Sequence, residues 1–152
     1  MPQMHIYPTS FQAVDNVIFH QEDGRETRKI LLGRKENEPH WRFPGGFVDP
    51  SDNSLENAAA RERGEEIGLD CECSRPEYLF SFRVPDPRYF EGPDKIMSAV
   101  FKSLYMWGIP KGHDDIAEVR WFSYEQIRTQ YKIMVMPCHH PLVERLISHG
   151  LL

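Results

Sequence analysis

The sequence predicts a single layered α/β domain. Three observations support this prediction. Apolar segments of strand length alternate with segments of helical periodicity, polar turn residues separate them, and the 152-residue chain suits one domain with a sizeable core. The chain shows no internal repeat, linker or low-complexity segment. We therefore expect one domain over residues 1–152, with strands and three helices in mixed order.

The predicted strands are rich in apolar and β-branched residues. The first two flank the turn pair Asp23-Gly24 and are expected to form a hairpin. A brief strand is expected just before Pro44, and the longest apolar stretch is expected to be a central strand. The predicted strands cover residues 9–19, 29–34, 41–43, 77–84, 96–107 and 117–122.

Local capping patterns define the predicted helices. Ser54 is a good N-cap for a helix over residues 55–67, and Gly68 is the glycine expected just past its end. Ser123 begins a second helix, because Gln126 three residues later completes a capping-box pattern. The last helix is expected over residues 141–149, with one apolar face formed by Leu142, Val143, Leu146 and Ile147.

Composition excludes several classes of protein. The net charge of −5 argues against a broad nucleic-acid-binding surface. No apolar run approaches the roughly 20 residues that span a bilayer, and residues 1–10 show no secretory signal pattern. The cysteines are Cys71, Cys73 and Cys138. Their odd number and spacing fit no disulfide framework or zinc site, so we expect free thiols in a reducing cytoplasm.

The end of the helix at 55–67 carries an unusual concentration of acidic side chains. At about 100° per residue, Glu62, Glu65 and Glu66 share an arc of roughly 100° on one helix face. The pair Glu62 and Glu66 repels at i,i+4, and the helix macrodipole disfavours anions at this end. A divalent cation held by oxygen ligands would turn these penalties into attraction. The alternative is a solvated acidic helix end.

This segment resembles the signature of the Nudix hydrolases. Gly46 matches the first glycine of that signature, and residues 61–69 (RERGEEIGL) match its second half, with Arg61-Glu62, Glu65-Glu66 and Gly68 in register. Residues 41–45 look like the usual lead-in, and residues 114–122 are similar to a common loop-to-strand segment. The resemblance implies a Nudix-like α/β/α sandwich with a mixed β-sheet and a loop–helix–loop.

The chain departs from the signature at three points. Fourteen residues separate Gly46 from Arg61, where the signature has thirteen. The first glutamate of the signature is therefore replaced by Asp52 or Asn53, depending on where the additional residue falls. Arg63 occupies a position that is usually hydrophobic, so the signature does not predict how the helix packs at this point.

The resemblance implies a catalytic and metal-binding role for the helix. Glu62, Glu65 and Glu66 would be ligands of Mg²⁺ or Mn²⁺, with Gly46 offering a backbone carbonyl. Arg61 would orient a glutamate by charge-assisted hydrogen bonds.

The resemblance also implies one more acidic site residue, from a loop far from the helix in the sequence. It would act as metal ligand or general base. Asp115 is our choice, although Asp114 and Glu118 lie in the same region and a turn aspartate is the alternative interpretation.

Binding of an anionic diphosphate would need cations and aromatic side chains. We select Arg34 and Arg88 as cations and Tyr89 as a partner that stacks on a nucleobase. Arg42 and Arg83 are further candidate cations. Phe90 and Trp107 could also stack on a base, but we expect both to pack in the core. The segment 138–140, Cys-His-His, is interpreted as a loop that caps the last helix.

The predicted function is Mg²⁺-dependent or Mn²⁺-dependent hydrolysis of a nucleoside diphosphate linked to another group. Pro85 lies where the ADP-ribose-hydrolysing subgroup has a proline, which favours ADP-ribose or a related nucleotide sugar. The alternatives are dinucleoside polyphosphates, modified nucleoside triphosphates or capped RNA as substrates, and a non-catalytic nucleotide-sensing domain. We expect a small-molecule partner, no nucleic acid, no membrane, and a homodimer as an open option.

Overall fold

A curled, seven-stranded mixed sheet organises the computed structural model, which describes residues 4–86 and 95–152. The strand order is β4-β6-β1-β2-β7, while β3 pairs with β1 and β5 pairs with β6. The β1–β6 pair is parallel and the other pairs are antiparallel. The strands are β1 (Phe11–Glu22), β2 (Arg25–Lys35), β3 (Gly45–Phe47), β4 (Cys71–Cys73), β5 (Glu77–Val84), β6 (Ile96–Gly108) and β7 (Ile116–Ser123).

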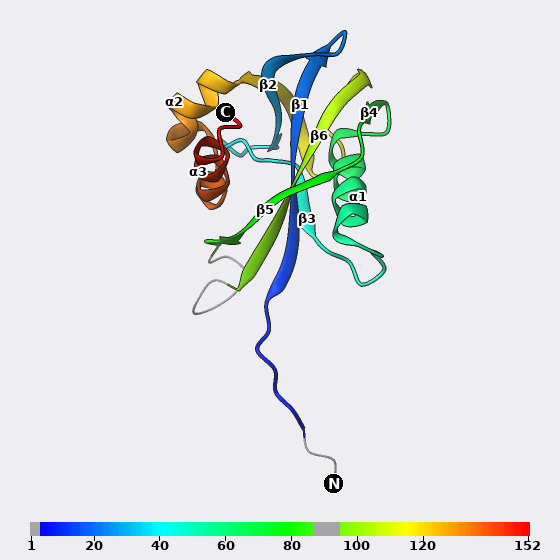
Figure 1. Cartoon of the computed structure of the whole chain (residues 1–152), viewed down its shortest axis with the longest axis vertical. Helices are drawn as coiled ribbons and strands as arrows, with labels where there is room; N and C mark the ends of the chain where they lie inside the picture. Colours follow the sequence, from blue (N-terminus) through cyan, green and yellow to red (C-terminus); the bar gives the residue numbers. More distant parts are fainter. Residues whose placement is uncertain (1–3, 87–94) are drawn as a thin grey trace.

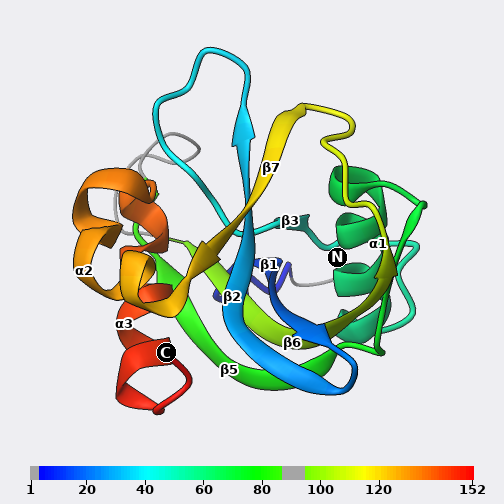
Figure 2. The same cartoon turned by 90° about the horizontal axis from the view of Figure 1, so that it is seen from above.

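Helices cover both faces of this sheet (Figure 1, Figure 2). One side carries α1 (Leu55–Ile67), and the other carries α2 (Tyr124–Met134) and α3 (His140–Ser148), which a short 3₁₀ turn at Pro137–His139 precedes. This arrangement explains the apolar run of β1, because alternate side chains enter different clusters. Val17 and Phe19 pack in the cluster beneath α2 and α3, whereas Val14 packs with the alanines of α1.

The structure confirms the predicted helix that carries the acidic residues. α1 covers Leu55–Ile67, and the Ser54 hydroxyl accepts a hydrogen bond from the Asn57 N–H at 3.0 Å. Gly68 ends the helix with φ +86°, a conformation that glycine adopts without steric cost. The predicted capping box of Ser123 and Gln126 is also present at the start of α2. The predicted β1–β2 hairpin is confirmed as well.

Other expectations need correction. Residues 41–43 form only isolated bridges from Trp41 and Arg42, and the strand lies at Gly45–Phe47 instead. β4 was missed because it is only three residues long and flanked by polar residues. The expectation that Trp107 packs in the core is wrong, since 62% of this residue is exposed. It lies near the end of the long β6, beyond the part that the core covers.

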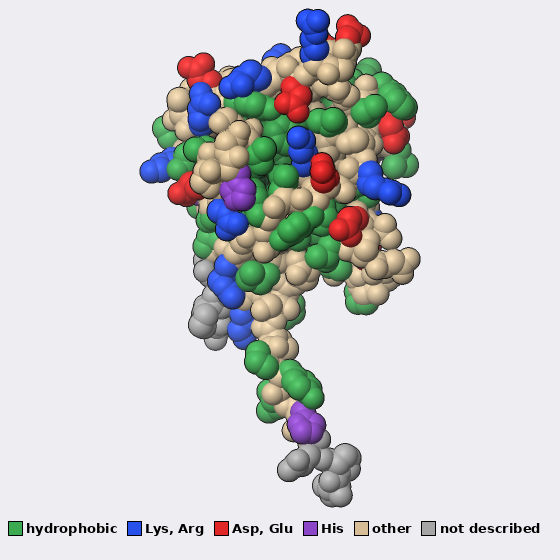
Figure 3. Space-filling model, in the orientation of Figure 1, with side chains coloured by type: hydrophobic (Ala, Val, Ile, Leu, Met, Phe, Trp, Pro, Cys, Tyr) green, Lys and Arg blue, Asp and Glu red, His purple; other side chains and the backbone are tan. Residues whose placement is uncertain are grey.

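The surface agrees with the modest net charge. On the face shown in Figure 3, acidic and basic side chains are interspersed among apolar ones. Within the part of the chain that the structure describes, no helix combines the length and apolar character needed to cross a membrane.

Candidate active site

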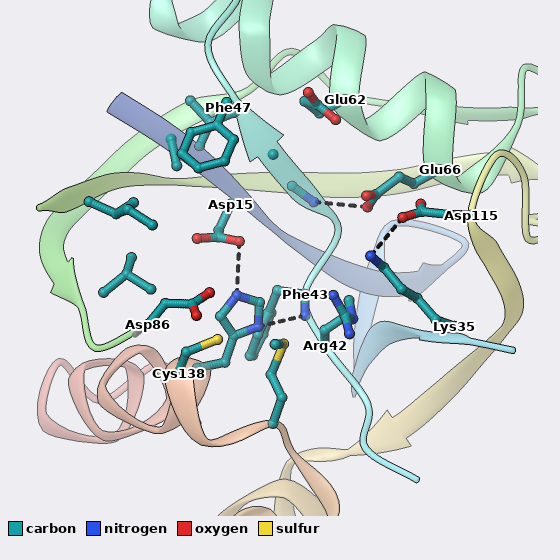
Figure 4. Close-up of a pocket in the computed structure, with 18 of the residues that line it drawn as sticks. Asp15, Lys35, Arg42, Phe43, Phe47, Glu62, Glu66, Asp86, Asp115 and Cys138 are labelled. Carbon is teal, nitrogen blue, oxygen red and sulfur yellow. Dashed lines mark hydrogen bonds and ion pairs between the residues drawn. The ribbon is translucent and has the colours of Figure 1, made fainter. Parts of the chain in front are cut away.

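A cavity of about 310 Å³ opens between α1, the β1–β3 pair and the turn before α3. Figure 4 shows Glu66 and Asp115 on one side of this cavity and Asp15 and Asp86 on the other. The first side brings together residues that are far apart in the sequence, because α1 lies against β3 and the loop before β7. We call this side the glutamate end; its lining includes Lys35, Gly46, Glu62, Glu65, Glu66, Asp114 and Asp115.

Burial dominates the electrostatics of the glutamate end. Glu66 is only 7% exposed, and its Oε2 accepts a hydrogen bond from the Gly45 N–H at 2.9 Å. Burial, together with the nearby carboxylates of Glu62, Asp115 and Asp15, raises the pKa of Glu66 to about 8, although that hydrogen bond acts in the opposite direction. Burial also raises the pKa of Glu62. The side chain of Glu65 is 47% exposed, so it lies at the rim.

Gly46 lies where the Glu62 side chain of α1 approaches β3 closely. A Cβ added at this position would lie 2.6 Å from the carboxyl carbon of Glu62, which is shorter than real Cβ contacts. The chain reaches this point through the β3–β1 register, which pairs Gly46 with Val14. The glycine of the signature therefore gives the Glu62 carboxylate room against the strand.

Arg61 ties the loop before α1 to the helix. Its Nε and Nη2 donate to the two carboxylate oxygens of Asp52 at 2.9 and 2.8 Å. Its Nη1 donates to Glu62 at 3.0 Å and to Glu65 at 3.2 Å. The bonds from Arg61 lower the pKa of Asp52 to about 2. Asp52, not Asn53, therefore occupies the place of the missing glutamate, and the additional residue falls between Asp52 and Arg61.

Arg63 faces polar partners and not the apolar core. Its Nη1 donates to the Ser74 carbonyl at 3.0 Å and to the Ser103 hydroxyl at 2.6 Å. These bonds join α1 to the segment after β4 and to β6. They explain how an arginine is accommodated at a position that is usually hydrophobic.

Of the three acidic candidates before and within β7, two lie at the cavity. Asp115 Oδ2 pairs with the Lys35 Nζ at 2.7 Å, and Asp114 lies beside it in the lining. Glu118 points elsewhere and pairs with Arg34 at 2.5 Å and with Arg120 at 2.7 Å. Asp115 therefore lies on the same side of the cavity as the glutamates, as its selection required, and forms an ion pair with the Lys35 side chain.

The expected substrate-binding residues are placed less favourably. Arg34 stacks over the ring of Trp41 at 4.7 Å, pairs with Glu118 and does not line the cavity. Arg88 and Tyr89 lie outside the described residues. Among the described residues, Lys35 and Arg42 are the lysine and arginine side chains that line the cavity. Sequence reasoning missed Lys35, although its position directly after Arg34 in a strand puts it on the opposite face.

Arg42 is nearly buried in the cavity wall. Its guanidinium pairs with Glu38, while its Nε is buried and has no hydrogen-bond partner within residues 4–86 and 95–152. An unsatisfied buried donor is costly. The guanidinium of Arg42 also lines the cavity, where its positive charge is suited to hold a phosphate oxygen.

The other side of the cavity contains a polar pair that sequence reasoning missed. Asp15 Oδ1 lies 3.2 Å from His139 Nε2, and both residues are buried. The interpretation of residues 138–140 as a cap needs correction, because His139 makes no side-chain capping bond to α3. A signal for Asp15 exists in the sequence: it interrupts the apolar run of β1, where a buried polar residue needs a partner.

The chemistry of the glutamate end fits a divalent cation. Carboxylate oxygens are the ligands that Mg²⁺ and Mn²⁺ prefer. The buried Glu66 carboxylate faces β3, and its hydrogen bond from the Gly45 N–H offsets little of the cost of burying its charge. Among the described residues, no three His, Cys, Asp or Glu side chains are already grouped closely enough to hold a metal ion. Glu62 and Glu65 are instead held by Arg61.

A family model described as a NUDIX domain matches residues 10–146. This match covers most of the chain, and the curled mixed sheet with flanking helices is the α/β fold of that family. The chain therefore belongs to the Nudix family.

The chain is also similar in sequence to individual curated proteins. The chain is 27% identical over 146 residues to an ADPR responsive transcriptional repressor NtrR of Acinetobacter baylyi, with 93% of this chain and 55% of that protein covered. The chain thus spans about half the length of this relative.

Two solved structures share the fold. The NUDIX domain of Shewanella oneidensis NrtR complexed with ADP ribose has a TM-score of 0.67 and 22% identity, covering 95% of this chain and 90% of that one. A bifunctional NMN adenylyltransferase/ADP ribose pyrophosphatase of Francisella tularensis, complexed with AMP and a Mn ion, has a TM-score of 0.68 and 20% identity, covering 94% and 42%.

Proposed function

We propose that this protein hydrolyses a nucleoside diphosphate linked to another group in a Mg²⁺-dependent or Mn²⁺-dependent reaction, and that the substrate is ADP-ribose. One observation carries the proposal: Glu62, Glu65 and Glu66 of α1 line the same cavity as the cations Lys35 and Arg42. Acidic and basic groups so arranged suit a diphosphate that is bound partly through a metal ion. The family and the ADP-ribose complex of a structural relative support the choice of substrate.

The residues of the cavity have separate roles in this proposal. Glu62, Glu65 and Glu66 would hold the cation, which when bound supplies positive charge at the diphosphate. Lys35 and Arg42 bind the diphosphate oxygens, and Asp115 orients Lys35 through its Oδ2.

The proton and the products follow from the same assignment. Asp115 Oδ1, the oxygen not paired with Lys35, accepts a proton from the attacking water. Water adds to one phosphorus and the bridging P–O bond breaks, so the products from ADP-ribose are AMP and ribose 5-phosphate.

Replacement of a cavity glutamate tests the proposal. We expect Glu65→Gln to lower turnover of ADP-ribose by about 100-fold or more, because charge stabilisation at a transferring phosphoryl group is a large contribution to catalysis. The control is Glu144→Gln, an exposed position on α3, which should keep wild-type turnover. Circular dichroism checks that both variants fold. Near wild-type turnover of Glu65→Gln with Mg²⁺ would refute the site assignment.

A second candidate function is a non-catalytic ADP-ribose sensor. The relative described as a repressor favours it, as does the engagement of Glu62 and Glu65 by Arg61. Isothermal titration with ADP-ribose, with and without Mg²⁺, followed by product analysis separates the two candidates. Binding without turnover would support the sensor, and release of AMP would support the enzyme.

The substrate is tested by a hydrolysis screen in Mg²⁺ and in Mn²⁺. The panel contains ADP-ribose, other nucleotide sugars, dinucleoside polyphosphates, modified nucleoside triphosphates and capped RNA. The proposal expects the highest kcat/KM for ADP-ribose. A higher value for another member would move the substrate assignment to that class.

A further inference from the structure

The side of the cavity opposite the glutamate end differs in chemistry, and we call it the aspartate end. It combines two buried carboxylates, Asp15 and Asp86, with His139 and with the apolar side chains of Ala13, Val84 and Ile96. Apolar walls with a few fixed polar groups are typical of sites that bind a ring and set its orientation. In the proposed function the diphosphate binds near Lys35, together with the cation that the glutamates would hold, so the aspartate end remains for another part of the substrate.

Asp15 is held in one position by two partners. Its Oδ1 pairs with His139 Nε2 at 3.2 Å, and its Oδ2 accepts the Ser98 hydroxyl at 2.5 Å. The Phe43 N–H donates to His139 Nδ1 at 3.1 Å. Because Nδ1 accepts, the ring proton of neutral His139 is on Nε2, where it donates to Asp15.

These two bonds leave acceptor capacity on the Asp15 carboxylate. A carboxylate offers about four lone-pair positions, and the two partners use two of them. Asp15 belongs to the cavity lining. A group that binds against it must therefore donate a hydrogen bond, since a carboxylate can only accept.

We infer that the aspartate end binds the nucleobase of the substrate and that Asp15 is a specificity-determining residue that accepts a hydrogen bond from the exocyclic amino group of that base. His139 and Ser98 are positioning residues, because they fix the carboxylate and do not themselves supply the contact. The inference rests on the proposed function in assuming a nucleotide ligand. It predicts selection of an amino-bearing purine over a base with a carbonyl group at the same position.

The selectivity should be substantial because the carboxylate is buried. A base with a carbonyl there would face Asp15 with two acceptors, and a base lacking the substituent would leave the acceptor unused. Sites that hydrogen-bond a substrate group reject analogues without it more strongly than apolar pockets do. We expect the wild-type protein to favour ADP-ribose by about tenfold or more over the unsubstituted-purine analogue and by more over the inosine analogue.

Asp15→Asn gives a sharp variant test. The Asn oxygen can still accept from His139, while its NH₂ group replaces the other oxygen, and the Ser98 hydroxyl can turn to accept from it. The variant therefore keeps the shape of the site but offers a donor where the wild type offers an acceptor. We expect the preference for adenine over hypoxanthine to fall to about one or to invert. The control is Asp70→Asn, at an exposed position in a turn, which should keep the wild-type ratio.

The measurement is the ratio of affinities and of kcat/KM for the three nucleotides. Affinities come from calorimetry with the metal-free protein in chelator, so they do not depend on turnover. Discrimination in binding, with no hydrolysis after Mg²⁺ or Mn²⁺ is added, would refute the proposed enzyme and support this inference. Hydrolysis with equal values for the three bases would refute this inference and leave the enzyme standing.

Two further outcomes also decide the question. Equal affinities for the bases together with loss of binding by a 2′-deoxyribose analogue would mean that the aspartate end contacts the sugar, which overturns the inference. An unchanged base ratio in folded Asp15→Asn overturns it as well. Should that variant fail to fold, the comparison of ADP-ribose with its unsubstituted-purine analogue on the wild-type protein decides alone.

Discussion

The two ends of the cavity both contain buried carboxylates, but the chain compensates them differently. At the glutamate end, Glu66 accepts a single backbone N–H, and burial raises its pKa to about 8. At the aspartate end, Asp15 has a partner for each oxygen, His139 and Ser98. The charged form of Glu66 would need a cation from outside the chain to stabilise it. Asp15 is stabilised by hydrogen bonds from side chains of the protein itself.

This difference separates two uses of a buried acid. An uncompensated acid suits a cation, because the ion supplies the missing charge. A compensated acid suits recognition, because its position is fixed before the ligand arrives and little reorganisation is needed on binding. The structure thus supports a division of the cavity into a part for chemistry and a part for selection, and mutations at the two ends should have opposite effects on stability.

The largest effect on stability is expected at the aspartate end. His139→Leu removes the donor to Asp15 and the acceptor of the Phe43 N–H, which leaves two buried polar groups unsatisfied. We expect the free energy of unfolding to fall by about 3 kcal/mol, measured by urea unfolding. His5→Leu, in the exposed segment before β1, should change it by less than about 0.5 kcal/mol. Equal effects of the two substitutions would mean that the buried pair is not compensated as described.

The opposite sign is expected at the glutamate end. In the metal-free protein, folded Glu66 keeps its proton up to about pH 8, whereas in the unfolded chain it ionises near pH 4.5. Stability from this group therefore falls as pH rises through that window. Glu66→Gln does not titrate and can still accept the Gly45 N–H, so its stability in chelator should exceed that of the wild type above pH 8. Thermal unfolding from pH 5 to 9 measures this.

Addition of Mg²⁺ completes the Glu66 experiment. Wild-type melting temperature at pH 8 should rise on adding Mg²⁺, because binding to the folded state stabilises it, and the rise should be smaller for Glu66→Gln. Glu65→Gln is the matched control in chelator, since the Glu65 side chain is 47% exposed and its neutralisation relieves little burial. Identical pH profiles of wild type and Glu66→Gln would contradict the contrast between the two ends.

A smaller effect concerns the loop that leads into α1. The hydrogen bonds from Arg61 lower the pKa of Asp52 to about 2, so this aspartate stabilises the fold above about pH 4 and loses that contribution as pH falls toward 2. Asp52→Asn should be less stable than the wild type at pH 7 and converge with it near pH 2. Urea midpoints across this range measure the difference. A constant gap between the two proteins at all pH values would show that charge is not the cause.

Local sequence signals were sufficient for the part of the site on α1. Ser54 and Gly68 mark its ends, and the spacing of Glu62, Glu65 and Glu66 follows from helix periodicity alone. The structure confirms the helix, while the metal-binding role remains a prediction. Asp52 needed the structure, because only its pairing with Arg61 decides between it and Asn53.

The aspartate end could not be found in the same way. Asp15 meets His139 only because the sheet brings β1 next to the turn before α3, a contact between residues more than 120 positions apart. Lys35 reaches Asp115 through the β2–β7 pairing. Such contacts depend on register and curvature of the sheet, which local patterns do not specify. The prediction that Trp107 packs in the core was wrong for a related reason. The hydrophobicity of a strand does not indicate at which residue the core that covers it ends.

The exposed tip of the loop before α1 has a consequence for engineering. The loop is fixed before and after its tip, by the Val48 N–H bond to the Gln12 carbonyl and by the Asp52–Arg61 pair. The segment between these anchors is exposed at Pro50 and Ser51. Changes of length there would be absorbed without moving α1. This tip is therefore a promising point at which to graft a peptide label, whose response to ligand would report on the neighbouring glutamates.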